Sequence, residues 1–134
     1  MVKENGEKLN SFSEIANSYL KETSDFVDYL RKKIKFSEEC AMLSQSEEAR
    51  NYYHFKEKAL EDLMKQAIKY LSRQEYLQIS FRGKLQAKLK SLEKILNDEE
   101  LDEEEKHLAL YEREKLENWC REFEDFKNKR SSFG

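Results

Sequence analysis

The chain has 134 residues, of which 40% are charged and 38% are hydrophobic, and its formal charge is -3 at pH 7. This length suits a single domain, and the slightly acidic balance argues against a general nucleic-acid binder, which is usually basic. Proline is absent and glycine occurs only three times. We therefore expect long helices with solvated faces instead of a fold with many tight turns.

Apolar residues at spacings of three, four and seven predict a first helix over residues 11–43. Its buried stripe consists of Phe12, Ile15, Tyr19, Phe26, Leu30 and Ile34. Ser11 and Glu14 fit a capping box, in which the hydroxyl and the carboxylate satisfy backbone N–H groups at a helix start. Residues 1–10 are expected to form a flexible N-terminus.

A second capping box, Ser44 with Glu47, precedes an apolar pattern at threes and fours that continues for about fifty residues. The stripe consists of Tyr52, Leu60, Leu63, Ala67, Leu71, Leu77, Phe81, Leu85, Leu89, Leu92 and Leu96. A continuous helix over 45–97 would be roughly 75 Å long, at 1.5 Å per residue. Gly83 disfavours helix by about 1 kcal/mol relative to alanine, so a break near Ser80 to Gly83 is the alternative.

Asn97 and Asp98 end this pattern, and Asp102 with Glu105 can cap a third helix. The buried side of the third helix is expected to carry Leu108, Tyr111, Leu116, Trp119, Phe123 and Phe126. Residues 131–134 are expected to be flexible.

Narrow apolar stripes on helices of this length must each pack along a neighbouring helix or a second chain. Short connections favour antiparallel neighbours. The predicted fold is therefore an all-α, elongated, antiparallel three-helix bundle or coiled coil, with one helical domain over 11–130. The alternative is a compact four-helix bundle with a break near Gly83, in which residues 84–97 fold back. The candidate interface residues are Leu77, Phe81, Leu85, Leu89, Trp119 and Phe123.

The residues that enzymes use for catalysis do not form a recognisable pattern, so we expect no enzyme, no metal and no cofactor. Glu104-x-x-His107 matches half of a di-iron carboxylate site. The second half is missing, because Asn51 stands at the required spacing before His54. The acidic run 98–105 lacks the glycine of a calcium loop, and its carboxylates suit the positive end of a helix dipole. Phosphate loops, nucleophile elbows and zinc spacings are absent.

Cys40 and Cys120 are far apart and fit neither a metal nor a redox spacing. This predicts reduced thiols in a cytoplasmic protein. No apolar stretch approaches the roughly 20 residues that are needed to cross a bilayer, and the first ten residues are too polar for a signal peptide.

Charge is distributed unevenly among the predicted helices. Residues 11–43 hold six acidic and five basic side chains, 45–97 hold seven and eleven, and 98–130 hold thirteen and seven. The simplest explanation is attraction between the last two helices, at about 0.2–1 kcal/mol per exposed pair. The alternative is binding to anionic lipid, to which each basic side chain contributes about 1 kcal/mol.

The candidate lipid-binding residues form two clusters, namely Arg82, Lys84, Lys88, Lys90 and Lys94, and Arg31, Lys32, Lys33 and Lys35. At 100° per residue, Lys84 and Lys88 flank the Leu85 stripe, whereas Lys90 and Lys94 point roughly to the opposite face. A single flat basic patch is therefore not required by the spacing.

Three stretches of the chain share features with one known family. FSEECAMLSQSEE (36–48) is similar to the end of that family's first long helix, and IKYLSRQEYLQISFRGKLQAKLKSLEK (68–94) is similar to its middle helix. EREKLENWCREFEDFKNKR (112–130) is similar to the start of its third helix. Together they resemble the BAR region of the sorting nexins over about residues 20–130.

The resemblance implies a banana-shaped, dimeric coiled coil that supports curved anionic membranes in endosomal trafficking, with the basic residues of 82–94 near its tip. The third helix is shorter than in that family, and the acidic run 98–105 would repel anionic lipid at the tip. The expected function is therefore a non-enzymatic helical scaffold, which the resemblance implies to be BAR-like and peripheral to endosomal membranes. The alternative is a soluble coiled-coil adaptor that binds a partner helix and no lipid. Its partner is a protein or a second copy, not nucleic acid.

Overall fold

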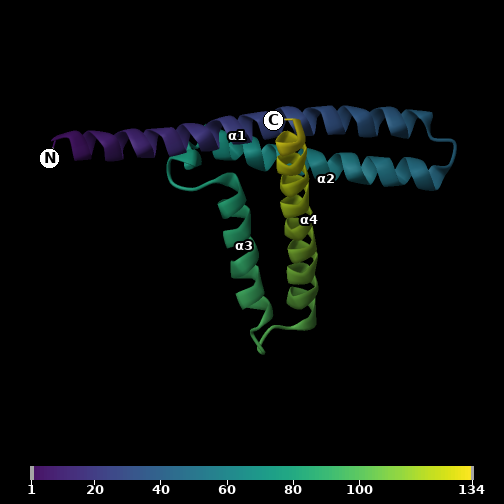
Figure 1. The fold of residues 1–134 in the computed structure, drawn as a ribbon. Coiled ribbons are helices and arrows are strands. Elements are labelled where there is room, and N and C mark those ends of the chain that lie inside the picture. The colour runs from purple at the N-terminus through teal and green to yellow at the C-terminus, as the bar shows by residue number, and fades with distance from the viewer. Residues whose placement is uncertain (1, 134) are drawn as a thin grey trace. The chain divides into compact units, whose positions relative to one another are not determined.

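The computed structural model describes the backbone of residues 2–133 and, within it, the side chains of residues 11–130. The elements in this range are all helical: α1 (Val2–Leu43), α2 (Glu47–Ser72), the 3-10 helix η1 (Glu75–Leu77), α3 (Phe81–Leu96) and α4 (Glu103–Phe133) (Figure 1). The all-α prediction is confirmed, with four long helices instead of three. The predicted flexible ends, 1–10 and 131–134, lie outside the residues whose side chains are described.

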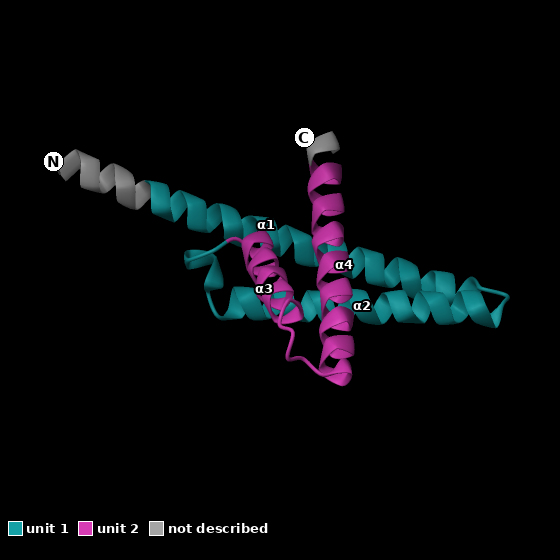
Figure 2. Ribbon diagram, turned by 90° about the horizontal axis from the view of Figure 1, so that it is seen from below, with its two compact units in different colours: residues 1–79 teal, residues 80–134 magenta. Residues whose placement is uncertain are grey.

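The chain divides into two compact units, residues 1–79 and residues 80–134 (Figure 2). In unit 1, α1 packs against α2, and η1 packs against both helices. In unit 2, α3 packs against α4. The sequence grouped residues 11–130 into one domain, whereas the structure groups them into two antiparallel helical hairpins, each with its own buried apolar residues.

The prediction of one continuous helix over 45–97 is wrong, because the helix is interrupted after Ser72. Gln74 adopts a left-handed backbone conformation with φ of 57°, the only non-glycine residue with positive φ in the described chain. The hydroxyl of Tyr70 donates a hydrogen bond of 2.6 Å to the carbonyl oxygen of Ile79. This bond holds the end of the linker against the last turns of α2.

Gly83 does not cause the interruption. It lies in the first turn of α3, and its N–H donates a hydrogen bond of 3.0 Å to the Oγ of Ser80, which is the N-cap. The alternative of a break near Gly83 therefore predicted the additional helix but misplaced the break, which spans residues 73–80.

Helix starts were predicted with mixed success. Asp102 caps α4 as expected, since the N–H of Glu105 donates a 2.7 Å hydrogen bond to its Oδ1. The start predicted at Ser11 is wrong, because α1 already begins at Val2. Polar capping residues thus mark a helix start only where the preceding residues do not continue the helix.

The second predicted cap is displaced by two residues. Ser46 is the N-cap of α2, and its Oγ accepts a 3.1 Å hydrogen bond from the N–H of Ala49. Ser44 instead donates a 2.6 Å hydrogen bond to the carbonyl of Cys40, at the end of α1. Its hydroxyl therefore helps to terminate α1 and does not start α2.

Buried side chains mark the contact side of each helix. Those of unit 1 are Ala16, Thr23, Phe26, Val27, Leu30, Ile34, Ser37 and Ala41 in α1, and Leu60, Leu63, Ala67 and Tyr70 in α2. Those of unit 2 are Phe81, Leu85, Leu116, Trp119, Phe123 and Phe126. Burying a valine, leucine, isoleucine or phenylalanine side chain stabilises the fold by about 1.5–3 kcal/mol, before the entropy of ordering that side chain is counted.

Most of the candidate interface residues are therefore buried within unit 2. The rings of Phe81 and Phe123 meet edge to face within unit 2, with centroids 6.0 Å apart. Leu85 and Trp119 are also buried, and Leu89 is half-buried. Leu77 is the one candidate of the six that is exposed.

Candidate interaction surfaces

Most of the large apolar side chains that remain exposed in the described chain gather at three places. The loop patch, at the α1–α2 connection, consists of Phe36, Met42, Leu43, Tyr52 and Phe55. The linker patch, at the other end of unit 1, consists of Phe12, Ile15, Leu77 and Ile79. The tip patch, near the α3–α4 connection, consists of Ile95, Leu108 and Tyr111.

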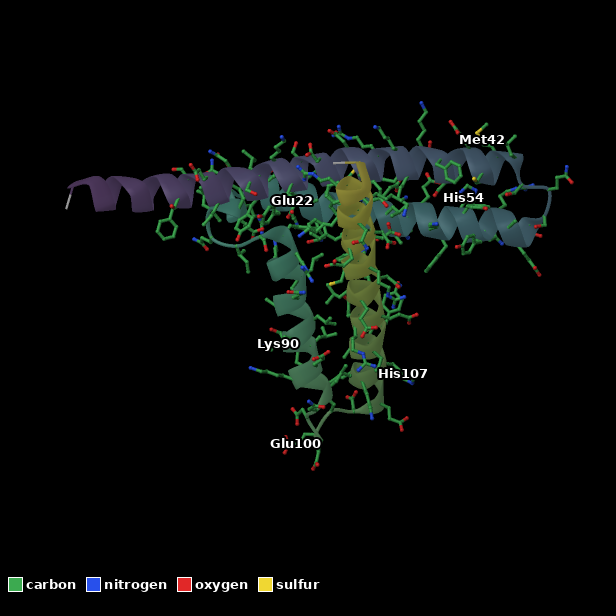
Figure 3. All side chains as sticks on the ribbon, in the orientation of Figure 1. Glu22, Met42, His54, Lys90, Glu100 and His107 are labelled. Atoms are coloured by element: carbon green, nitrogen blue, oxygen red, sulfur yellow. The ribbon has the colours of Figure 1, made fainter. Side chains whose placement is uncertain are left out.

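The loop patch contains the most exposed apolar side chains of the described residues. Examples are Met42 of α1, which is 85% exposed, and Phe55 of α2, which is 70% exposed. Figure 3 shows Met42 near the loop end of α1. Helical spacing places Phe36 and Leu43 together on α1, turned away from the buried Ile34. It places Tyr52 and Phe55 on the same side of the α1–α2 pair as Phe36.

A cluster of carboxylates lies on the other side of unit 1. Glu38 of α1 and Glu57 and Glu61 of α2 have side-chain oxygens within 4.8 Å of one another. Partial burial raises the pKa of Glu57, and a hydrogen bond and the negative charge of Glu38, with the charge of Glu61, raise it further. His54, whose Nδ1 lies 3.6 Å from a Glu57 oxygen, acts in the opposite direction.

The sequence reading missed this cluster because its members belong to two helices whose rotation about their axes is fixed only by packing. The one signal in the sequence was the pair Glu57 and Glu61 at i,i+4, where like charges repel. Among the described residues, the fold brings no group of metal-ligand side chains to the predicted half-site of a di-iron centre. His107 is exposed and points away from α3 (Figure 3).

The linker patch corrects the prediction that Phe12 and Ile15 are buried. Both lie on the side of α1 that faces α2 farther along the helix. However, α2 ends at Ser72 and is shorter than α1, at 26 residues against 42. The side chains of Phe12 and Ile15 are therefore exposed.

The two sides of the α3–α4 hairpin differ in chemistry. On one side, Arg82 pairs with Glu124 at 2.7 Å, and Arg113 lies 3.9 Å from Glu117. Burial raises the pKa of the Cys120 thiol, Glu124 and Glu117 add to the effect, and Arg82 opposes it. The tip patch lies on the other side, and it includes Leu108 and Tyr111, which the sequence predicted to be buried.

Within neither unit are the candidate lipid-binding residues all directed to one side. In unit 1, Arg31 lies 3.6 Å from Asp28, and the Nζ of Lys33 lies 5.4 Å from the ring centre of Tyr29. In unit 2, Arg82 is paired with Glu124, whereas Lys90 points away from α4 (Figure 3). The predicted separation of Lys90 from the Leu85 side of α3 agrees with this direction.

Comparison with known proteins gave no match to a protein-family model, a curated protein or a solved structure. Among the described helices, none combines the length and the apolarity that a bilayer crossing requires. Cys40 and Cys120 are both free cysteines.

Proposed function

We propose that this chain is a non-enzymatic helical interaction module whose loop patch binds an amphipathic helix of a partner protein. The observation that supports this proposal is the exposure of Phe36, Tyr52 and Phe55 on one side of a well-packed helical pair. Single exposed apolar residues are ordinary on protein surfaces, but several aromatic residues on one face are typical of interfaces.

The geometry suits a helical partner. Phe36 comes from α1 and Phe55 from α2, so the surface between them runs along the direction of both helices. A third helix that lies over this surface can insert its apolar residues between side chains of the two helices, as in ordinary helix packing. Aromatic residues at the centre of such an interface commonly contribute about 2 kcal/mol or more to the free energy of binding.

A photo-crosslinking amino acid at position 55 of the full chain, introduced in its own cells, tests the proposal. The matched control position is Lys65, which is exposed on the same helix about 15 Å from Phe55 and, two residues after the buried Leu63, is turned away from α1. We expect a discrete protein adduct from position 55 and none from position 65.

The protein identified in this way is then produced by itself, and its affinity is measured against three forms of the chain. Phe55→Ser is expected to weaken binding by at least about tenfold, since each 1.4 kcal/mol corresponds to a factor of ten. Lys65→Ser is expected to leave the affinity within about twofold. An unchanged affinity for the Phe55 variant, or no adduct from position 55, would contradict the proposal.

The second candidate is a peripheral membrane role of the BAR type. It is supported by the composition of α3, which carries five basic residues and one acidic residue, with Lys90 directed away from α4. The test is co-sedimentation with phosphatidylserine vesicles at low and physiological salt, with Lys90→Glu/Lys94→Glu as the variant. Binding of the wild type that the variant loses would support this role, and no binding at either salt would remove it.

A further inference from the structure

The segment between α2 and α3 interrupts an apolar stripe whose two parts are in register (Figure 1). Leu63 and Ala67 are buried in α2. Phe81 and Leu85, which are buried in α3, follow them by 18 residues each, which is five turns of an α-helix. The two buried faces would therefore lie in one line if residues 73–80 were helical.

The interruption carries a backbone strain that a continuous helix would not have. Gln74 has a φ of 57°, in the left-handed region that residues with a β-carbon avoid. Position 74 is seven residues after Ala67 and seven before Phe81, so a continuous helix would place Gln74 on the apolar stripe. It would also place the exposed Leu77 at the edge of this stripe, four residues before Phe81.

α1 is long enough to pack on such an extension of α2. It has 42 residues against 26 in α2, and Phe12 and Ile15 are exposed where α2 has already ended. Phe12 lies 31 residues before Leu43, the end of α1, and position 78 lies 31 residues after Glu47, the start of α2. Since the two helices are antiparallel and have the same rise per residue, Phe12 lies opposite position 78. Extension of α2 to this position would cover Phe12 and Ile15.

The hydrogen bonds that hold the interruption can be exchanged for those of a helix. The Ile79 carbonyl now accepts from the Tyr70 hydroxyl, and the Oγ of Ser80 accepts from the Gly83 N–H. In a continuous helix the Gly83 N–H would donate to the Ile79 carbonyl, four residues before it. The Tyr70 hydroxyl would then be released to Thr23 of α1, whose buried Oγ forms no hydrogen bond within the described structure. Burial raises the pKa of Tyr70 to about 12, and the nearby Thr23 hydroxyl opposes this rise.

We propose that residues 73–80 are a two-state hinge, which exchanges between the interrupted form of the structure and a continuous form in which α2 and α3 are one helix. The interrupted form is favoured by the cap at Ser80 and by the packing of η1 on α1 and α2. The continuous form is favoured by release of the strain at Gln74 and by cover for Phe12 and Ile15. Because each form has its own stabilising contacts, a modest change at one residue shifts the populations.

The hinge lies away from the loop patch, so this inference goes beyond the proposed partner site and does not depend on it. The linker patch is exposed in the interrupted form, whereas Phe12 and Ile15 are covered in the continuous form. The hinge therefore controls whether this apolar surface is available.

Carbon-13 NMR of the full chain measures the helical population of the hinge, because Cα chemical shifts report the backbone conformation of each residue. The main state of the wild type is expected to have non-helical shifts in the hinge. Saturation-transfer spectra should detect a second state, populated at about 0.1–10%, in which residues 73–80 have helical shifts.

Substitutions at two positions should change the ratio of the continuous to the interrupted form. Ser80→Ala removes a cap that only the interrupted form uses and should raise the ratio about twofold to thirtyfold. Gln74→Leu places an apolar side chain on the stripe and should raise it at least about tenfold. Gln74→Gly relieves the left-handed strain and weakens the helix, so it should lower the ratio at least about tenfold.

Two matched controls should leave the ratio within about twofold of the wild-type value. Gln86→Leu makes the same change at an exposed position of α3 that is turned away from the stripe, and Ser80→Asp keeps a capping oxygen. Circular dichroism checks that each variant is folded.

Three results would overturn the inference. The first is the absence of a helical second state in both the wild type and Ser80→Ala. The second is non-helical shifts at residues 73–80, without a helical second state, in folded Gln74→Leu/Ser80→Ala. The third is a higher helical population in Gln74→Gly, a variant that needs no destabilised protein. The partner binding measured with Phe55→Ser is a separate result, so either proposal can fail without the other.

Discussion

Glycine is expected to have opposite effects on stability at two positions around the break between α2 and α3. Gly83 has no positive φ and lies inside the first turn of α3. It is two residues before the buried Leu85, so a methyl group added at position 83 points away from α4. Gly83→Ala should therefore stabilise unit 2 by about 0.5–1 kcal/mol, because alanine loses less backbone entropy on folding.

At position 74, glycine is expected to increase the stability of the fold. The φ of 57° at Gln74 lies in the left-handed region, which costs a residue with a β-carbon about 1–2 kcal/mol. The side chain of Gln74 is exposed, so few contacts are lost on its removal. After subtraction of about 0.5–1 kcal/mol for the greater entropy of unfolded glycine, Gln74→Gly should stabilise unit 1 by about 0.5–1 kcal/mol.

Urea unfolding followed by circular dichroism measures both changes, and amide hydrogen exchange assigns them to their segments. Gly83→Ala should slow exchange across α3 by about two- to fivefold, since 1.4 kcal/mol corresponds to a factor of ten. Ala87→Gly, at an exposed position of the same helix, is the matched control and should speed exchange by a similar factor. Destabilisation by Gly83→Ala, or by Gln74→Gly, would refute the assignment of the break to residues 73–80.

Three further predictions concern single side chains. Tyr70→Phe removes the 2.6 Å hydrogen bond to the Ile79 carbonyl and should destabilise unit 1 by about 0.5–1.5 kcal/mol in urea unfolding; no change would mean that water replaces the bond at no cost. Asp102→Ala removes the N-cap of α4 and should cost about 0.5–2 kcal/mol, whereas Asp102→Asn should retain most of the stability. Because the pKa of Glu57 is raised in the folded state, the folded chain holds this proton more tightly, and its stability should fall as pH rises from the ordinary glutamate range through the raised pKa. Glu57→Gln should remove that part of the pH dependence and give a higher urea midpoint at neutral pH; an equal pH dependence in both proteins would contradict the shift.

Local sequence signals predicted the features that depend on a few neighbouring residues. The cap at Asp102 follows from a side chain that accepts a hydrogen bond from a nearby backbone N–H, and the end of α3 at Asn97 follows from the end of the apolar pattern; both are found. The buried faces of α1 near Phe26 and of α4 near Phe123 follow from periodicity at 3.6 residues per turn. Signals of the same kind failed at Ser11, where the preceding residues continue the helix.

The break after Ser72 could not be read from periodicity. The apolar spacing continues through Leu77 to Phe81, and glutamine at position 74 gives no indication of a left-handed conformation. The cost of the left-handed conformation at Gln74 is compensated by packing and by the hydrogen bond from Tyr70. Both interactions join residues that are not neighbours in the sequence, so a local pattern does not reveal them. The sequence also overstated the burial of Leu108 and Tyr111, whose spacing is helical but which are turned to one side of the α3–α4 hairpin.

The amino-acid sequence was sufficient to predict that this chain is helical, where α4 starts and α3 ends, and which residues carry charge, because these properties depend on local geometry and composition. The packing of the helices was needed to establish that there are two hairpins, which apolar residues remain exposed, and that three glutamates of α1 and α2 meet. Those properties depend on how far each helix extends beside its neighbour and on its rotation about its own axis, which are fixed by packing between residues far apart in the chain.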